Sequence, residues 1–171
     1  DAKGLLNAAI EDPNPVLFFE HKYLYRSLKE EVPEAYYTTE IGKANVVSTG
    51  DTLTIITYGL GVHWAIEEMN NRPEIQAEII DLRSLVPLDT ETVYTSVKKT
   101  GRAIVLHEDC ISGGIGGELT ALITEHCFEF LDAPVLRVGS LNSPVPFAAT
   151  IEAIFLPQDR FTKAVDQLLN Y

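Results

Sequence analysis

A glycine-rich loop is the first feature of the sequence whose residues could do chemistry. Residues 113–117 read Gly-Gly-Ile-Gly-Gly and lie between a strand-like apolar run and a helical pattern. In that place, backbone amides and a helix N-terminus can hold a phosphate group. A dinucleotide fingerprint, however, has glycine where Leu119 stands, and a phosphate loop has lysine followed by serine or threonine. The nearby carboxylates of Glu108 and Glu118 would also repel an anion. The sequence therefore favours tight turning and close helix–sheet packing in this loop.

Histidines offer a second possible source of chemistry. His107 lies with Glu108 and Asp109 at the carboxyl end of a predicted parallel strand, where α/β proteins often place acid–base groups. No serine elbow or activated cysteine pattern accompanies them. The remaining histidines have no metal-ligand spacing, such as two histidines four residues apart on one helix. We interpret these histidines as structural, and the residues alone predict a domain without a self-contained active site.

One stretch of the chain is acidic throughout. Between Arg102 and Arg137 there are six acidic residues and no lysine or arginine. These residues are Glu108, Asp109, Glu118, Glu125, Glu129 and Asp132. If several of them share one face, a basic partner would be steered there and could pair with the carboxylates. A solvated helix face with no partner is the alternative interpretation.

The composition is that of a globular protein and restricts the kinds of partner. Hydrophobic residues make up 46% and charged residues 22% of the 171 residues. No apolar run approaches the roughly 20 residues that span a bilayer. The net charge of −12 disfavours nucleic acid and anionic membrane as partners. The sequence opens at Asp1 with neither a start methionine nor a secretory signal, and its two cysteines have no metal-ligand spacing. We therefore expect a piece of a longer, soluble, cytoplasmic protein.

Strand-like and helical patterns alternate after residue 43. Strands are predicted at residues 52–58, 75–82, 103–106 and 134–138, with an edge strand at 44–48. Helices are predicted around residues 62–69, 90–99, 117–131 and 158–170. Helices of this length between strands imply right-handed crossovers and a sheet that is covered on both faces. The fold class is therefore predicted to be α/β, a three-layer sandwich with a mainly parallel sheet of about five strands.

The first 43 residues have a different organisation. Residues 2–10 are predicted to form a helix that stops at Asp12-Pro13, and the apolar residues 16–19 are predicted to form a buried strand. From residue 20 to 43, charges, tyrosines and Pro33 replace any regular period. We interpret that segment as a connector, so that a domain boundary falls within it.

Several motifs carry a resemblance to a known family. Residues 12–26 read DPNPVLFFEHKYLYR and residues 79–89 read IIDLRSLVPLD. His107-Glu108 with the glycine loop and then Leu131-Asp132-Ala133-Pro134 follow in matching order and spacing. Over nearly its whole length the chain resembles the C-terminal region of the beta chain of a thiamine-dependent 2-oxoacid dehydrogenase, of branched-chain (2-oxoisovalerate) or pyruvate type.

The resemblance implies a division of the chain. Residues 1–26 would be the end of the pyrimidine-binding domain, residues 27–43 a connector, and residues 44–171 a C-terminal domain of the transketolase type. In this family the alpha chain holds thiamine diphosphate and its magnesium ion, and the cofactor-activating residues lie in the earlier half of the beta chain. The resemblance therefore assigns no catalytic and no cofactor-binding residue to this chain, which by itself is expected to be inactive.

The resemblance also implies a reaction and partners for the intact enzyme. It would decarboxylate a branched-chain 2-oxoacid or pyruvate on its cofactor and pass the acyl group to a lipoyl arm. The expected partners are an alpha chain or fused alpha region, a second beta chain and the lipoyl acyltransferase core. The region around His107 and the ending Asn170-Tyr171 slightly favour the branched-chain type. Pyruvate and acetoin versions remain alternatives.

Two sets of residues follow from the resemblance. Branched-chain relatives place a potassium ion near the segment that corresponds to residues 9–14, so Ala9, Asp12 and Asn14 are expected to bind potassium in the intact chain. Hard oxygen ligands suit such an ion. The alternative is a helix end stopped by Asp-Pro. Similar bacterial beta chains dock the basic binding domain of the acyltransferase at positions that correspond to Asp132 and the carboxylate of Tyr171.

Two other functions remain open at this stage. The chain could be a stand-alone acidic α/β module that recruits a basic protein without enzymatic activity. It could also be a small nucleotide-binding domain that uses the glycine loop, although the residues around that loop disfavour it.

Overall fold

The computed structural model describes all residues from 1 to 171. Its helices are α1 (Ala2–Glu11), α2 (Leu24–Ser27), α3 (Leu60–Asn71), α4 (Thr90–Thr100), α5 (Gly116–Cys127), the 3₁₀ helix η1 (Phe128–Phe130), α6 (Ala149–Phe155) and α7 (Gln158–Leu169). Its strands are β1 (Asn45–Ser48), β2 (Leu53–Thr57), β3 (Ala77–Asp81), β4 (Ala103–Cys110) and β5 (Leu136–Ser140). None of the helices combines the length and the apolar character needed to cross a membrane.

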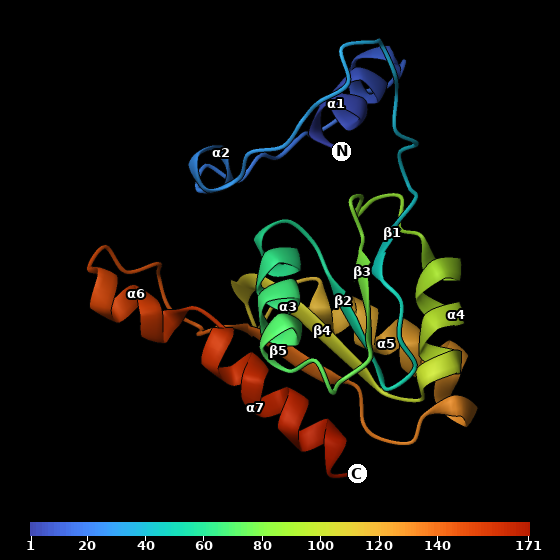
Figure 1. The fold of residues 1–171 in the computed structure, drawn as a ribbon, viewed down its shortest axis with the longest axis vertical. Coiled ribbons are helices and arrows are strands. Elements are labelled where there is room, and N and C mark those ends of the chain that lie inside the picture. Colours follow the sequence, from blue (N-terminus) through green and yellow to red (C-terminus); the bar gives the residue numbers. More distant parts are fainter.

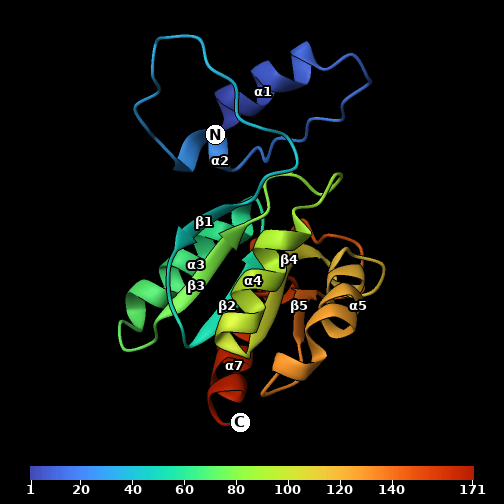
Figure 2. The same cartoon turned by 90° about the vertical axis from the view of Figure 1, so that its right-hand side faces the viewer.

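The strands form one sheet with helices on both faces. The strand order is β1-β3-β2-β4-β5; β1 is antiparallel to β3, and all other neighbours are parallel. Helices α3 and α7 cover one face, and α4 and α5 cover the other (Figures 1 and 2). The structure confirms the predicted three-layer sandwich and its edge strand.

The central strand β2 explains why both faces need cover. All five of its residues are buried. Leu53 and Ile55 point into the core beneath α3 and α7, and Ile56 points into the core beneath α4 and α5. Thr54 shares the second face, and its Oγ1 lies 2.7 Å from Oγ of Ser96 in α4. The only polar side chains along this strand are thus threonines, and Thr54 meets a hydrogen-bonding partner from the covering helix.

Helix α4 begins and ends at the residues that the sequence predicts. The carboxylate of Asp89 accepts hydrogen bonds from N and Oγ1 of Thr92, at 3.2 and 2.8 Å, and from N of Ala44 at 3.1 Å. Burial opposes ionisation of Asp89, but these hydrogen bonds outweigh it and leave the pKa of the carboxyl below its ordinary value. Gly101 ends the helix at φ 68°, a left-handed conformation that glycine adopts without steric cost.

The predicted buried strand at residues 16–19 is wrong for this chain. These residues are extended but belong to no strand, and the side chains of Leu17 and Phe19 are 84% and 87% exposed. A strand needs a neighbour for its backbone hydrogen bonds, and the five strands of the sheet all lie in residues 45–140. The apolar pattern is therefore present without the second sheet that would bury it.

Helix α6 was not predicted from the sequence. It is a short helix of seven residues that projects from the body beyond β5 (Figure 1). Arg160 fixes its end by donating hydrogen bonds to the carbonyl oxygens of Phe155 at 2.7 Å and Leu156 at 3.0 Å. The same guanidinium donates to the carbonyl of Gly139 in β5. A tertiary contact, rather than a local pattern, therefore holds α6 in place.

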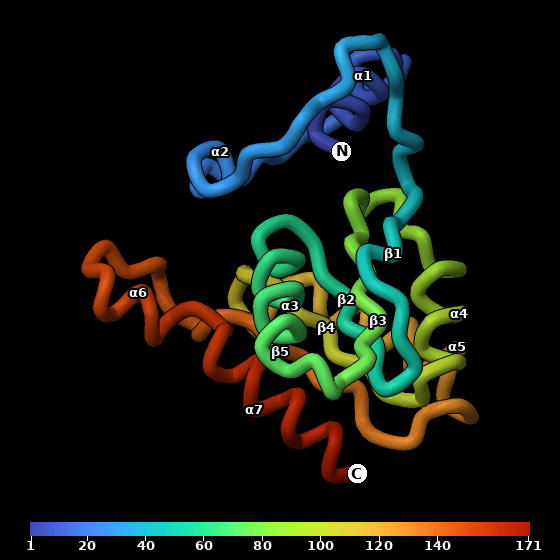
Figure 3. Tube along the Cα trace, viewed as in Figure 1, coloured from blue at the N-terminus to red at the C-terminus, as the bar shows by residue number.

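Residues 1–41 form a unit of their own, which we call the N-terminal unit, and residues 42–171 form the α/β body. The unit stands over the carboxyl ends of the parallel strands, and the chain runs from it directly into β1 (Figures 1 and 3). Within the unit, Nζ of Lys3 donates to the carbonyl oxygens of Glu34 and Ala35 at 3.1 and 2.9 Å. Nδ2 of Asn7 donates to the carbonyl of Tyr37 at 2.8 Å. Helix α1 is thus tied to the connector.

Candidate functional site

The carboxyl end of β4 brings His107 into the interior of the body. Its side chain is fully buried, and Nδ1 donates a hydrogen bond to the carbonyl of Asp109 at 3.0 Å, whereas Nε2 has no partner. Burial lowers the pKa of His107 from its ordinary value, because the charged ring would lose its solvation. Burial therefore favours the neutral form of the ring. This supports the structural interpretation of His107, with one ring nitrogen left unpaired.

The glycine loop closes around that ring. A Cβ atom at Gly116 would lie 2.5 Å from Nε2 of His107, and one at Gly114 would lie 2.7 Å from Cε1. A Cβ atom at Gly139 in β5 would likewise lie 2.7 Å from Cε1 of His107. These glycines are needed because the backbone lies against the imidazole. The loop therefore packs closely on a buried side chain.

Several titratable side chains lie at the carboxyl ends of the strands. Nε2 of His21, from the N-terminal unit, lies 2.8 Å from Oε2 of Glu108. Burial, together with the charges of Asp109 and Glu108, raises the pKa of Tyr58 at the end of β2. No group of three or more histidine, cysteine or acidic side chains could hold a metal ion. The thiol of Cys110 donates to the carbonyl of Leu141 at 3.2 Å, which fits a structural role.

The segment expected to bind potassium forms the end of α1. Oδ1 of Asp12 accepts hydrogen bonds from N and Nδ2 of Asn14 at 2.8 and 3.0 Å, which closes a local turn. Because Pro13 has no N–H, the carbonyl of Ala9 lacks the donor that a continuing helix would supply. An open hollow of about 470 Å³ is lined by residues that include Glu11, Asp12 and residues 38–41, so that Asp12 is the one expected ligand that lines it. The oxygen-rich environment is compatible with a cation, and the expectation stays a prediction.

Asp132 and Tyr171 lie at the opposite end of the body. Asp132 follows η1, is exposed, and donates its backbone N–H to the carbonyl of Gly101 at 2.8 Å, just before β4 begins. Tyr171 follows α7 and is exposed. Both views place the loop that leads into β5 beside the C-terminus (Figures 1 and 2). The two segments that carry the predicted docking residues therefore lie together at the end of the sheet where the parallel strands begin.

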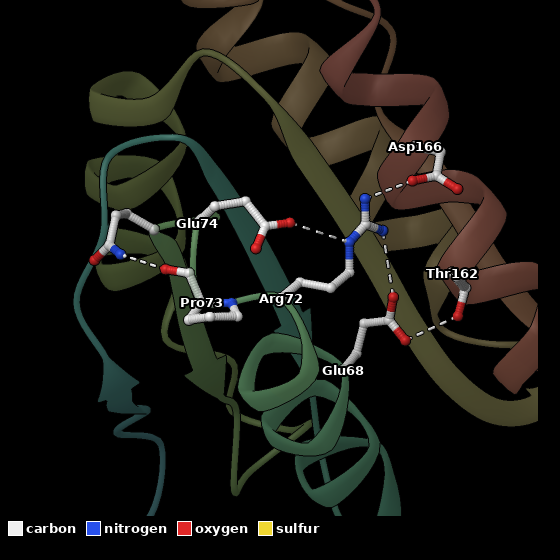
Figure 4. Close-up of polar contacts among 7 residues, drawn as sticks. Glu68, Arg72, Pro73, Glu74, Thr162 and Asp166 are labelled. Carbon is white, nitrogen blue, oxygen red and sulfur yellow. Dashed lines mark hydrogen bonds and ion pairs between the residues drawn. The ribbon is translucent and has the colours of Figure 1, made fainter.

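A charged network that the sequence analysis missed holds α7 against α3. Figure 4 shows Arg72, at the end of α3, reaching Asp166 in α7 at 2.6 Å and Glu68 at 3.4 Å. Glu74 lies 3.9 Å from Nε of Arg72, and Oγ1 of Thr162 donates to Glu68 at 2.8 Å. The hydrogen bond with Asp166 raises the pKa of Arg72. Because α7 leads directly to Tyr171, this network positions the C-terminus.

The acidic stretch divides between the two ends of the body. Glu108 and Asp109 lie at the carboxyl end of β4, where Nε2 of His21 contacts the carboxylate of Glu108. Glu118 and Glu125 are exposed and lie seven residues apart on α5, which puts them on one side of the helix. Glu129 and Asp132 continue the exposed acidic series toward the amino-end edge. The four residues from Glu118 to Asp132 therefore line the outside of α5 and the loop after it.

The body is thus an α/β domain with a mainly parallel sheet. The family described as transketolase, C-terminal domain, matches residues 42–160, and the chain belongs to this family. The 2-oxoisovalerate dehydrogenase subunit beta of Bacillus subtilis is 44% identical over 175 residues, covering 100% of this chain and 54% of that protein. The pyruvate dehydrogenase E1 component subunit beta of the same bacterium is 46% identical over 162 residues, covering 94% of this chain and 50% of that protein.

These relatives confirm the resemblance seen in the motifs. The chain spans about half the length of the curated relatives that it matches. Among solved structures, a split-gene transketolase described as an inactive beta4 tetramer is similar to this chain with a TM-score of 0.65 and 27% identity. The match covers 81% of this chain and 46% of that one. The predicted fold of the transketolase type is therefore confirmed.

The packing of glycine on His107 gives a first prediction. We expect Gly116→Ala to lower the free energy of unfolding by about 1–3 kcal/mol, because the new methyl group overlaps the buried imidazole. Gly117→Ala is the matched control: it adds the same helix propensity in α5, and its Cβ would meet only Nη1 of Arg137, at 3.6 Å. Urea denaturation followed by circular dichroism measures both. Equal stability of the two variants would contradict the packing role.

Proposed function

We propose that this chain is the C-terminal part of the beta chain of the decarboxylating component of a 2-oxoacid dehydrogenase complex. In this proposal it serves subunit assembly and docking to the acyltransferase core. The observation that carries the proposal is the match of the whole chain to about half of such beta subunits. The filled glycine loop supports it, since the place where an α/β domain often binds a ligand holds His107 instead.

The proposal assigns residues 1–26 to the end of a pyrimidine-binding domain, residues 27–43 to a connector and residues 44–171 to the C-terminal domain. The exposure of Leu17 and Phe19 supports this division. Apolar residues in an extended segment are costly to leave in water, and a strand of the preceding domain would bury them. The separate position of the N-terminal unit, over the end of the sheet, agrees with it (Figure 2).

The intact enzyme would use thiamine diphosphate and magnesium, which supply the carbanion chemistry of decarboxylation. The proposal assigns none of the residues of this chain to that cofactor, because the resemblance places the cofactor-binding groups in the alpha chain and the earlier half of the beta chain. The close packing of the glycine loop on His107 and the acidic groups near the loop support this. The partners in the proposal are an alpha chain or fused alpha region and a second beta chain, in the cytoplasm. The substrate is a branched-chain 2-oxoacid or pyruvate.

Reconstitution tests the enzymatic part of the proposal. The full-length beta chain, mixed with its alpha chain and thiamine diphosphate, is expected to release carbon dioxide from 2-oxoisovalerate or pyruvate. The 171-residue chain in place of the full-length one is expected to give none, because it holds no cofactor-activating residues. Carbon dioxide release is measured with each 2-oxoacid in turn. Turnover by the 171-residue chain alone, or no turnover by the full-length pair, would contradict the proposal.

The potassium site is a further part of the proposal. The unpaired carbonyl of Ala9 and the side-chain oxygens of Asp12 and Asn14 would be ligands, with others from the preceding half of the chain. We expect the full-length protein to melt at a higher temperature in potassium chloride than in choline chloride of equal ionic strength. Asp12→Ala should remove that difference. Identical melting curves in the two salts would exclude the site.

Docking is proposed at Asp132 and at the carboxylate of Tyr171. Their segments share one edge of the body, and the acidic series along α5 adds attraction for a basic partner. The partner in the proposal is the small basic binding domain of the lipoyl acyltransferase. Arg72 would assist indirectly, because it fixes α7 and thereby Tyr171.

Binding of that domain tests the docking surface. Asp132→Ala should weaken binding by a factor of tens or more, since truncating one partner of a buried charge pair costs roughly 2–5 kcal/mol. Glu91→Gln is the matched control, because it removes one exposed negative charge outside the proposed docking surface. Glu91 lies in the first turn of α4, whereas Asp132 lies near the last turn of that helix. Titration calorimetry measures both variants. If Asp132→Ala binds as tightly as Glu91→Gln, Asp132 does not dock the acyltransferase.

The exposed acidic series gives some support to the second candidate, an interaction module without an enzyme. The residues Glu118, Glu125, Glu129 and Asp132 are exposed, and no lysine or arginine lies between them in the sequence. The sequence that precedes Asp1 in the gene separates the candidates. A thiamine-binding domain there supports the enzyme component, and an unrelated sequence supports the module.

A further inference from the structure

The loop from Leu82 to Asp89, which we call the anchor loop, follows β3 and faces the N-terminal unit. Its residue Arg83 is the only residue other than glycine with a positive φ, at 56°. The N–H of Ser84 donates to the carbonyl of Leu82 at 2.5 Å, so that Arg83 is the central residue of a γ-turn. Such a turn with positive φ is rare and strained, because Cβ crowds the backbone.

The anchor loop is built to hold that strained turn. Oδ1 of Asp81 accepts a hydrogen bond from N of Arg83 at 3.0 Å, and N of Leu82 donates to the carbonyl of Thr57 at 2.9 Å. Both contacts come from the carboxyl ends of the central parallel strands β3 and β2. Glycine would adopt the same conformation without steric cost. A long cationic side chain at this position therefore indicates that the side chain itself is used.

The guanidinium of Arg83 is used in a two-point contact with the N-terminal unit. Nε and Nη2 lie 3.0 and 2.6 Å from the two carboxylate oxygens of Asp1, the residue that precedes α1. The Arg83 side chain is only 16% exposed, so the pair is partly withdrawn from water. A bidentate pair of this kind fixes orientation as well as distance, which a lysine would not do.

Few other polar contacts join the unit to the body. Between residues 1–41 and residues 42–171, the side-chain contacts are the Asp1–Arg83 pair and the contact of His21 with Glu108. At the boundary itself, N of Gly42 donates to Oγ of Ser84, the neighbour of Arg83, at 3.0 Å. The anchor loop thus supplies both the boundary contact and one of the two contacts that reach the unit itself.

We propose that Arg83 is a positioning residue that sets the orientation of the N-terminal unit on the α/β body through its pair with Asp1. The meaning of this inference for the enzyme rests on the proposed function, in which residues 1–26 of the unit are the end of the pyrimidine-binding domain. Arg83 then fixes how that domain sits against the C-terminal domain. The partner that the anchor loop recognises is a carboxylate at the start of a helix of the neighbouring domain.

A distance measurement tests the anchor in the 171-residue chain. Spin labels go on Ile10→Cys in α1, where the native side chain is 74% exposed, and on Thr95→Cys, an exposed site in α4, with Cys110→Ser in the background. Cys127 is buried and stays. The wild-type background should give one narrow distribution of label distances by pulsed electron resonance. Arg83→Ala should make it roughly twofold wider, since the unit then samples several orientations.

Variants at the pair separate positioning from a general effect on folding. Asp1→Asn should broaden the distribution as much as Arg83→Ala does, and the double variant should broaden it no further, because both remove one interaction. Arg83→Gly should also broaden it, while the body melts no lower than in Arg83→Ala because the turn is relieved of strain. Arg83→Lys should be intermediate. Arg137→Ala, which removes an exposed arginine on β5, is the control and should leave the distribution narrow.

Two results would overturn the proposal. One is a distribution as narrow in Arg83→Ala and Arg83→Gly as in the wild type. The other is broadening in the double variant equal to the sum of the two single variants, which would show that Asp1 and Arg83 act separately. The measurement needs no cofactor, alpha chain or acyltransferase. Its failure therefore leaves the proposed enzyme role standing, and an inactive reconstituted enzyme leaves the anchor standing.

Discussion

The central strand β2 can exist only if both faces of the sheet are covered, and most of the architecture follows from this. Its five residues are buried, so apolar helix faces must lie above and below it. Helices α3 and α7 supply one cover and α4 and α5 the other. Once these faces are occupied, the two edges where strands begin and end, and the outer sides of the helices, are left for contacts with other groups.

The two ends of the parallel strands make different contacts. At the carboxyl edge, where an α/β domain often binds a ligand, His107 and its surrounding glycines fill the space, and the anchor loop meets the N-terminal unit. At the amino edge, the loop after η1 and the end of α7 lie together, with Asp132 and Tyr171 exposed. A domain arranged in this way is suited to holding other parts of an assembly. This agrees with the proposed role as the non-catalytic end of a beta chain.

Contacts between residues far apart in sequence hold the less regular parts. Arg160 fixes the end of α6 by binding carbonyls there and in β5, and Arg72 joins α3 to α7 through Asp166. Arg83 reaches Asp1 across more than eighty positions of the chain. In each case an arginine binds two or more oxygens. The guanidinium is planar and has several donors, so each additional hydrogen bond costs little further side-chain conformational entropy. These contacts orient elements that the apolar core alone does not fix.

The sequence by itself determined the fold class, the strands of the body, its helices other than α6 and the limits of α4, because burial period, capping residues and glycine positions are local properties. The residues around the glycine loop also disfavoured phosphate binding there. It could not reveal that the loop packs on His107, that α6 is held by Arg160, or that Asp1 pairs with Arg83, because these contacts join residues distant in sequence. The apolar run at residues 16–19 shows the same limit. Its pattern is that of a strand, but only a neighbouring sheet decides whether a strand forms, and this chain provides none there.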